Sequence, residues 1–289
     1  MDVLNTFSIV AHDAEEQAWG VAVASKFLAA GALVNWARAG VGAVATQAFA
    51  RVGYGPQGLD LMAQGYSAEE AVSTLLAGDP DTTRRQVACV DAQGRVAAYT
   101  GPDCIEWAGH CLGSNYSCQG NLLTGPDVVD AMSRAFERVR GQLATRLFAA
   151  LVAGNSAGGD RRGKQSAALL VVRPGGGYGG DTDRYLDLRV DDDPDPLRKL
   201  SQLLRLHQLY FGDSAPEQRL SIDEELAAEL QTMLVEQGYY HGPINGTWDE
   251  ASIAAFWQFV STENLEERWN PGDAYRLDPV ILNFVRERF

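Results

Sequence analysis

Residues 6–26 read TFSIVAHDAEEQAWGVAVASK, and this stretch predicts a β-hairpin that begins on a threonine. Two largely apolar strands, 6–11 and 20–26, flank a polar connection. Counting back from that connection sets Thr6 opposite Ser25, with Lys26 next along the second strand. The hairpin therefore offers a hydroxyl and a nearby lysine within one short segment.

The alternation along the first strand indicates which way its side chains face. Residues two apart share a face at ~6.8 Å spacing, so Thr6, Ser8 and Val10 face one way. Phe7 and Ile9 face apolar packing on the other side. An ordinary hairpin, in which threonine and serine are only strand formers, is the alternative interpretation.

A strand led by threonine is where an N-terminal nucleophile would lie. An α-amine has a pKa of about 7.7–8.0, so near neutral pH it can accept the proton of the threonine hydroxyl. A lysine nearby keeps that amine from being fully protonated. Thr6 is internal in this chain, so the mechanism requires cleavage between Asn5 and Thr6. The freed hydroxyl would attack an amide or ester carbonyl.

Composition excludes several functional classes. The chain has 289 residues, of which 46% are hydrophobic and 21% charged, which is typical of a globular protein. A net charge of −14 argues against binding nucleic acid. The sequence has no run of ~20 apolar residues, so it predicts no membrane span. Residues 1–5 lack the basic and apolar pattern of a signal peptide, so we expect a cytoplasmic protein.

The cysteines are expected to be reduced thiols in small buried positions. Cys104, Cys111 and Cys118 are spaced seven apart with His110 among them, which raises the alternative of a zinc-dependent hydrolase. Zinc ligands usually come in pairs two to four residues apart, and this spacing differs. We therefore expect neither a metal nor another cofactor.

The order of the remaining elements predicts stacked sheets covered by layers of helices, an α+β fold. The segment 110–125 is predicted as strand or loop. Strands are expected at 40–47, 86–91, 95–100, 166–172 and 185–190, and helices at 54–62, 67–78, 127–140, 145–153 and 196–210.

Several separated motifs together resemble the DUF1028 family over about residues 6–200. They are the hairpin, Gly42–Gln47, Gln119–Asn121 and Gly158–Leu169. The family is assigned to the N-terminal-nucleophile hydrolase fold, a four-layer αββα sandwich. The resemblance implies that Thr6 is the nucleophile, with Ser25 and Lys26 at the end of the paired strand. The spacing of Lys26 departs from that in proteasome subunits, whose lysine comes from a later strand.

The same resemblance implies where a reaction oxyanion would be bound. Thr46 and Gln47 end the third strand at the mouth of the cleft, and Asn121 supplies an amide donor. In the loop 160–164, Arg161 is a candidate to bind a substrate carboxylate, although such loops are commonly only solvated. His110 is either a general base or a structural histidine.

A linker-like composition at 212–217 predicts a domain boundary, with one domain at 1–212 and a smaller helical one at 213–289. Helices at 222–237 and 252–260 flank the loop GYYHGPINGTW at 238–248. This arrangement resembles the peptidoglycan-binding domain. It implies a muropeptide-derived or other small peptide ligand, or else only packing and dimerisation.

Two functions therefore stay open. One is an intracellular amidohydrolase of the N-terminal-nucleophile type that acts on a small amide or peptide-like substrate. The other is a non-catalytic ligand-binding or assembly protein on the same fold. In both, we expect a homodimer that binds neither nucleic acid nor membranes.

Overall fold

The computed structural model describes residues 6–212 and 214–289, and the chain divides into two compact units after Leu203. This division lies inside α6 (Pro196–Phe211), whereas the boundary expected from the sequence lies just after that helix. The helix agrees with the prediction of one at 196–210. The domain limits 1–212 and 213–289 stay a prediction.

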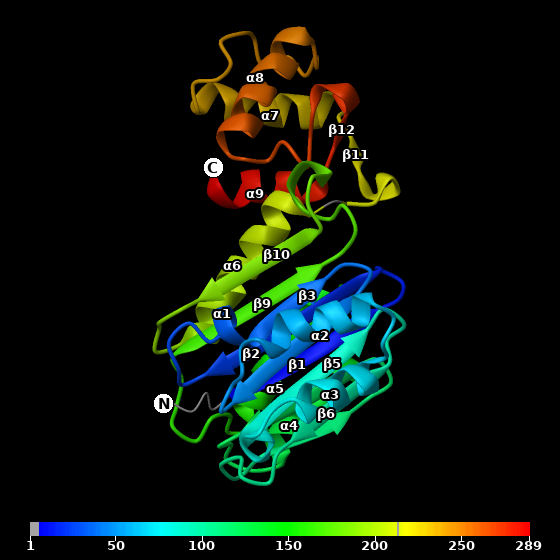
Figure 1. The fold of residues 1–289 in the computed structure, drawn as a ribbon. Coiled ribbons are helices and arrows are strands. Elements are labelled where there is room, and N and C mark those ends of the chain that lie inside the picture. Colours follow the sequence, from blue (N-terminus) through cyan, green and yellow to red (C-terminus); the bar gives the residue numbers. More distant parts are fainter. Residues whose placement is uncertain (1–5, 213) are drawn as a thin grey trace. The chain divides into compact units, whose positions relative to one another are not determined.

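The first unit contains two antiparallel sheets (Figure 1). Sheet 1 has the strand order β10-β9-β2-β1-β8-β7, and sheet 2 has the order β3-β4-β5-β6. The strands of sheet 1 are β1 (Thr6–Asp13), β2 (Ala18–Ser25), β7 (Gly109–Leu112), β8 (Tyr116–Asn121), β9 (Ser166–Val172) and β10 (Arg184–Val190). Those of sheet 2 are β3 (Asn35–Arg38), β4 (Gly42–Ala48), β5 (Arg85–Asp91) and β6 (Val96–Thr100).

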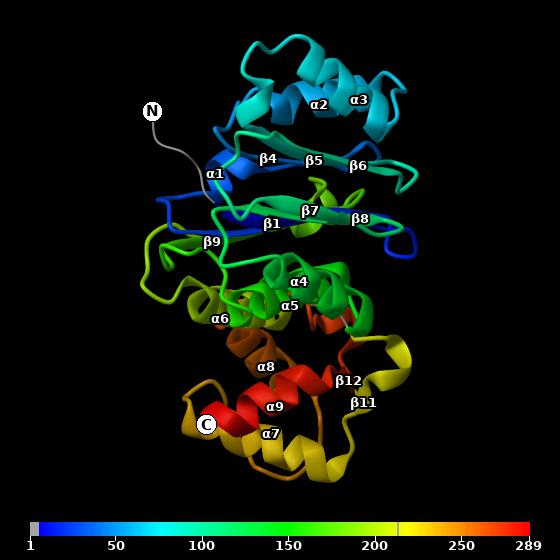
Figure 2. The same cartoon turned by 90° about the horizontal axis from the view of Figure 1, so that it is seen from below.

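Helices cover the outer face of each sheet, so the unit is an αββα sandwich, as predicted (Figure 2). Sheet 2 is covered by α2 (Tyr54–Ala63) and α3 (Ala68–Ala77). Sheet 1 is covered by α4 (Asp127–Arg138) and α5 (Leu143–Ser156). The short helix α1 (Gly31–Val34) leads into β3, and the sequence predicts neither element.

The start of α3 shows how local sequence sets an element boundary. The Ser67 Oγ atom accepts the backbone N–H of Glu70 at 3.2 Å, and the Glu70 carboxylate accepts the N–H of Ser67 at 2.8 Å. This reciprocal capping box satisfies two backbone donors that the first turn of a helix leaves without partners. The predicted start at Ser67 is confirmed.

The hairpin register expected from residues 6–26 is confirmed. Thr6 pairs with Ser25 across β1 and β2, and on its other side Thr6 pairs with Asn121 of β8. Val10 and Val23 lie in the apolar layer between the sheets, together with Ala45 and Ala88 of sheet 2. Phe7 and Ile9, one residue out of phase, are buried on the opposite face of sheet 1. Strand alternation thus separates the layer between the sheets from the layer under α5.

The second unit has a core of its own, built mainly from three helices and a short strand pair. The helices are α7 (Glu224–Glu236), α8 (Glu250–Thr262) and α9 (Pro279–Arg288), and the strands are β11 (Leu220–Ser221) and β12 (Arg276–Leu277). Phe256 packs edge-on against Trp269 at 4.8 Å between ring centroids, and both are buried. The sequence predicts α7 and α8 but not α9.

No helix in the described part of the chain is long and apolar enough to cross a membrane.

Candidate functional site

Thr6 is the first residue of β1 and lies at one end of the layer between the sheets. Its side chain is completely buried, and its Oγ1 donates a hydrogen bond to the Ser25 Oγ at 3.1 Å. The antiparallel register fixes this contact, because directly opposite residues share a face of the sheet. The two hydroxyl groups that the hairpin predicts to be neighbours are therefore in contact.

Beside this pair lies a network of buried polar side chains, and Gln86 sets the direction of its hydrogen bonds. The Gln86 Nε2 donates to the carbonyl oxygens of Gly120, at 2.8 Å, and Gly109, at 3.2 Å. Carbonyl oxygens can only accept hydrogen bonds, so the end of the Gln86 amide that faces them must be the NH₂ group. The other end is therefore the Oε1, which can only accept. The Gln86 Oε1 accepts hydrogen bonds from the Gln47 Nε2 at 2.8 Å and from the Asn121 Nδ2 at 3.0 Å.

The network continues from Gln47 back into sheet 1. The Ser8 hydroxyl donates to the Gln47 Oε1 at 2.6 Å and accepts the Gln119 Nε2 at 2.7 Å. The Gln119 Oε1 in turn accepts the Ser117 hydroxyl at 2.7 Å. All of these side chains are buried, so the end of the sandwich that holds Thr6 is polar, while the rest of the layer is apolar. Buried networks of this kind stabilise one arrangement strongly when every member is paired.

One atom of the network is not paired. The Asn121 Oδ1 is buried and has no hydrogen-bond partner among the described residues. Its amide cannot simply be reversed, because the Nδ2 is required by the Gln86 Oε1. A buried acceptor without a partner costs about 1–3 kcal/mol. Such atoms are rare in proteins and commonly mark a site where water or a ligand binds. This one belongs to the residue directly opposite Thr6.

The structure separates the two residues proposed at the end of β4. Gln47 faces sheet 1, where it contacts Ser8. Thr46 is buried on the other face, and its hydroxyl donates to the carbonyl oxygen of Arg51 at 3.2 Å. Only Gln47 of the two therefore contributes a side chain to the polar network around Thr6.

Lys26 follows the end of β2, and its side chain is exposed rather than directed into the buried network. Its backbone N–H donates to the Oδ2 of Asp160 at 2.9 Å. Asp160 also forms an ion pair with Arg162 at 2.8 Å, and its side chain is 1% exposed. The candidate Arg161 is exposed, so the arginine that this loop holds against a buried carboxylate is Arg162.

A small pocket of about 70 Å³ lies next to Ser25, and Asp160 and Ser166 also line it. Phe7 and Ala24 form part of its wall, which places it toward the α5 side of sheet 1. It has room for no more than a few water molecules.

The cysteines and His110 do not form a metal centre within the described residues, because no group of three or more metal-ligating side chains gathers there. Cys89, Cys104 and Cys118 are buried thiols, whereas Cys111 is half-buried. His110 lies in β7, and its Nδ1 is 2.9 Å from the Thr100 hydroxyl. Thr100 in turn accepts the Gln86 Nε2, so His110 is joined to the edge of the polar network.

Sequence reasoning missed Ser8, Gln86, Gln119 and Ser117 as members of this site. The alternating polar residues at 117, 119 and 121 carried a usable signal, because period-two polarity on a buried strand indicates a polar face. Gln86 had no such signal, since its partners come from strands 23 and 34 residues further along the chain.

Comparison with protein families matches residues 6–200 to the "Family of unknown function (DUF1028)" and residues 210–285 to the "Putative peptidoglycan binding domain". Among solved structures, the chain is similar to the crystal structure of protein SPO2555 from Silicibacter pomeroyi, which is itself assigned to DUF1028. The two share 32% sequence identity with a TM-score of 0.64, and the match covers 71% of this chain and 89% of that one. Comparison with curated proteins found no match.

Proposed function

Because the chain belongs to the DUF1028 family, whose function is unknown, we propose from its own geometry that it is a hydrolase with Thr6 as an N-terminal nucleophile. The observation that carries the proposal is the contact between the Thr6 and Ser25 hydroxyl groups in the polar end of the sandwich. The proposed reaction is hydrolysis of a C–N bond in a small amide or peptide-like substrate.

The reaction begins with cleavage between Asn5 and Thr6, and Asn5 lies outside the described residues. Cleavage makes the nitrogen of Thr6 an amine that can accept a proton from the Thr6 hydroxyl. In the uncleaved chain the Ser25 Oγ accepts that proton in a hydrogen bond, so Ser25 already orients the nucleophile. Lys26, one residue beyond Ser25, has an exposed side chain, so its positive charge favours a neutral amine only from the solvent side, where water weakens the effect.

The Thr6 oxygen then attacks the substrate carbonyl carbon, and the carbonyl oxygen becomes negatively charged. Asn121 and Gln47 support this step, because each amide nitrogen donates one N–H to Gln86 and has a second N–H that no described residue accepts. Collapse of the tetrahedral intermediate breaks the C–N bond, and the leaving nitrogen takes the proton held by the amine. Water then releases the acyl group from Thr6 by the same steps in reverse order.

The second unit supports a narrower choice of substrate. Its match to a family described as binding peptidoglycan suggests a carbohydrate or peptidoglycan-like ligand. We therefore propose that the substrate amide belongs to a muropeptide-derived or other small peptide. In this proposal the reaction takes place in the cytoplasm, on fragments taken into the cell.

One observation favours a second candidate function, a non-catalytic ligand-binding protein. Thr6 is 0% exposed in the uncleaved chain, and the pocket next to Ser25 is about 70 Å³. A nucleophile buried in this way cannot contact a substrate unless cleavage or a conformational change exposes it. If residues 1–5 stay attached, ligand binding is the better explanation of the polar site.

The test is the intact mass and N-terminal residue of the purified full chain, followed by turnover of an aminoacyl amide library and a muropeptide mixture. The hydrolase proposal expects a wild-type chain that begins at Thr6 and releases amine. Thr6→Ser should retain processing and turnover, whereas Thr6→Ala should abolish both. Ser117→Ala is a matched control, because it removes a buried hydroxyl from the far end of the same network. A chain that keeps Asn5, or a processed chain that hydrolyses nothing, would overturn the proposal.

A further inference from the structure

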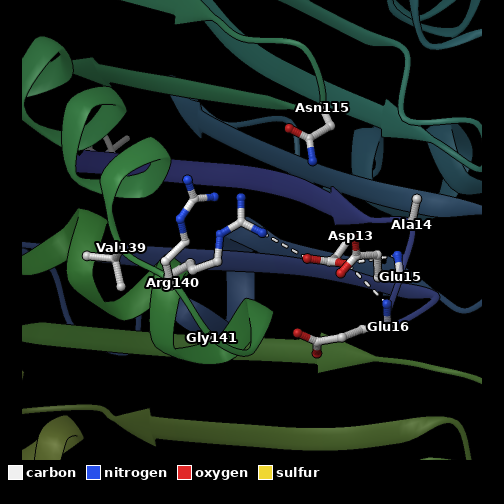
Figure 3. A pocket seen from close by; sticks show the side chains of 9 residues that line it. Asp13, Ala14, Glu15, Glu16, Asn115, Val139, Arg140 and Gly141 are labelled. Carbon is white, nitrogen blue, oxygen red and sulfur yellow. Dashed lines mark hydrogen bonds and ion pairs between the residues drawn. The ribbon is translucent and has the colours of Figure 1, made fainter.

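A second pocket lies at the opposite end of β1, about 23 Å from Thr6 if the strand rises 3.3 Å per residue. Its volume is about 450 Å³, within the range of small-molecule sites. The residues that line it come from the end of β1 and the β1–β2 turn, from the loop before β8, and from the α4–α5 connection and the start of α5 (Figure 3). They are Asp13, Ala14, Glu15, Glu16, Asn115, Val139, Arg140, Gly141 and Arg146.

Part of the wall is held in place by the protein itself. Arg146 forms an ion pair with Asp13 at 2.8 Å, and its guanidinium lies 4.2 Å from the ring centre of Phe136. The other oxygen of Asp13 accepts the backbone N–H groups of Glu15 and Glu16, at 2.9 and 3.0 Å. These contacts fix the turn and neutralise Arg146, so neither Asp13 nor Arg146 needs a ligand to balance its charge.

Arg140 is different, because no described residue accepts a hydrogen bond from it or pairs with its charge. Figure 3 shows Arg140 on the α4–α5 connection, across the pocket from Glu15 and Glu16. A guanidinium group presents several donors in a planar fork that matches a carboxylate. Since Arg146 is already neutralised by Asp13, Arg140 is the cation among the described lining residues that can bind an anion.

The facing wall supplies acceptors. Glu15 has an exposed carboxylate that no described residue pairs with. Glu16 is half-buried and accepts the backbone N–H of Leu143 at 2.8 Å, at the start of α5. Burial raises the pKa of Glu16, although the charges of Arg173 and Arg146 partly oppose this shift. The Asn115 Nδ2 donates to the carbonyl oxygen of His12, which leaves the Asn115 Oδ1 as a further acceptor.

We propose that this pocket binds a zwitterion, a group that carries both an ammonium and a carboxylate. The ligand is either a free amino acid or a short peptide with both groups at one end. The carboxylate pairs with Arg140, and the ammonium pairs with Glu15 and Glu16. A simple anion would meet the carboxylates of Glu15 and Glu16, whereas a simple cation would meet the positive charge of Arg140. A ligand with both charges satisfies both sides. This inference does not depend on the hydrolase proposal.

The test is a heteronuclear NMR titration of the full-length protein with L-amino acids and D-alanine, with propionate and propylamine as probes that carry one charge each. We expect at least one amino acid to shift the backbone resonances of Asn115 and Gly141. Propionate and propylamine should bind about tenfold more weakly or worse. Arg140→Ala should weaken amino-acid binding at least about tenfold, and Glu15→Gln with Glu16→Gln should do the same.

Arg134→Ala is the matched control, because Arg134 is an exposed arginine on α4 outside the pocket. This variant should bind the amino acid with the same affinity as the wild type. The proposal is overturned if no amino acid shifts these resonances at about 10 mM, a concentration that detects even weak complexes. It is also overturned if propionate binds as tightly as the best amino acid. Unchanged affinity in Arg140→Ala would overturn it as well.

Discussion

The side chain of Gln86 in sheet 2 accepts a hydrogen bond from Asn121 in sheet 1, at 3.0 Å, and both side chains are buried between the sheets. Gln86 also donates to two backbone carbonyl oxygens of sheet 1 strands, those of Gly109 and Gly120. One glutamine thus joins the two sheets and fixes the orientation of the amide that faces Thr6. A substitution of Gln86 should therefore disturb both sheets and the amide opposite Thr6.

Gln86→Leu should destabilise the protein by about 2–4 kcal/mol, because it leaves the amides of Gln47 and Asn121 without their shared acceptor. Urea unfolding at neutral pH measures the loss. Gln57→Leu is the matched control, since Gln57 is exposed on α2, and its effect should stay within about 0.5 kcal/mol. Equal effects of the two substitutions would show that the network does not support the fold.

Asp79 provides a prediction about pH. Its carboxylate accepts the Nε of Arg85 at 2.8 Å and the hydroxyl of Tyr54 at 2.7 Å. The largest effect comes from the hydrogen bonds that Arg85 donates, which hold the pKa of Asp79 well below its usual range. A lowered folded-state pKa stabilises the protein above the unfolded-state value of about 3.9, and the stabilisation is lost as the pH falls through the folded-state value.

Asp79→Asn should therefore cost about 3 kcal/mol at pH 7, and the difference from the wild type should shrink in acid. Urea unfolding at pH 7 and at about pH 3 measures both differences. Asp60→Asn is the same change in an exposed ion pair with Arg38, and it should cost less than about 1 kcal/mol. A difference for Asp79→Asn that does not change with pH would contradict the assignment.

The fold is largely predictable because its elements carry local signals. The hairpin register follows from the length of one polar connection, so the contact between Thr6 and Ser25 can be inferred from the sequence alone. Ser67 similarly indicates the start of α3. By contrast, α1 and β3 are four residues each and show too little periodicity to be recognised. The expected homodimer stays a prediction.

The candidate site is only partly predictable, because it depends on pairing between distant strands. The sequence places Thr46 and Gln47 together at the site, although neighbours on a strand face opposite ways and only one can face Thr6. Lys26 is likewise one residue out of phase with Ser25 and is exposed. No local pattern identifies the strands that Gln86 contacts, so sequence reasoning misses the residue that organises the network.

The cysteines should differ sharply in reactivity, because the thiolate is the reactive form and burial disfavours it. Burial raises the pKa of Cys89 to about 12 and that of Cys104 to about 11. Cys118 is also buried with a raised pKa, whereas Cys111 is half-buried. Ellman's reagent should therefore label Cys111 first in the native protein, and Cys111→Ser should remove this rapid phase. Labelling of all four thiols at equal rates before unfolding would refute the prediction.

The second unit contains a buried ion pair whose removal should be costly. Arg268 and Asp278 are 2.7 Å apart, with side chains 5% and 0% exposed. Asp278 also accepts the Ser214 hydroxyl at 2.9 Å and the backbone N–H of Val280 at 2.8 Å, which places it at the start of α9. The Arg268 guanidinium additionally donates to the carbonyl oxygens of Gln208 and Leu209. The pair thus ties three segments of the unit to one another.

Arg268→Met retains much of the side-chain volume but leaves the Asp278 carboxylate buried without a cation, so we expect a loss of about 3–5 kcal/mol. Tryptophan fluorescence during urea unfolding reports it, because Trp248 and Trp269 are buried in the same core. Arg286→Met is the matched control, since Arg286 pairs with Glu229 at 2.7 Å but is 55% exposed, and it should cost less than about 1 kcal/mol. If the two variants lose the same free energy of unfolding, the ion pair with Arg268 does not stabilise the buried carboxylate of Asp278. Apolar burial would then have to explain the stability of α9.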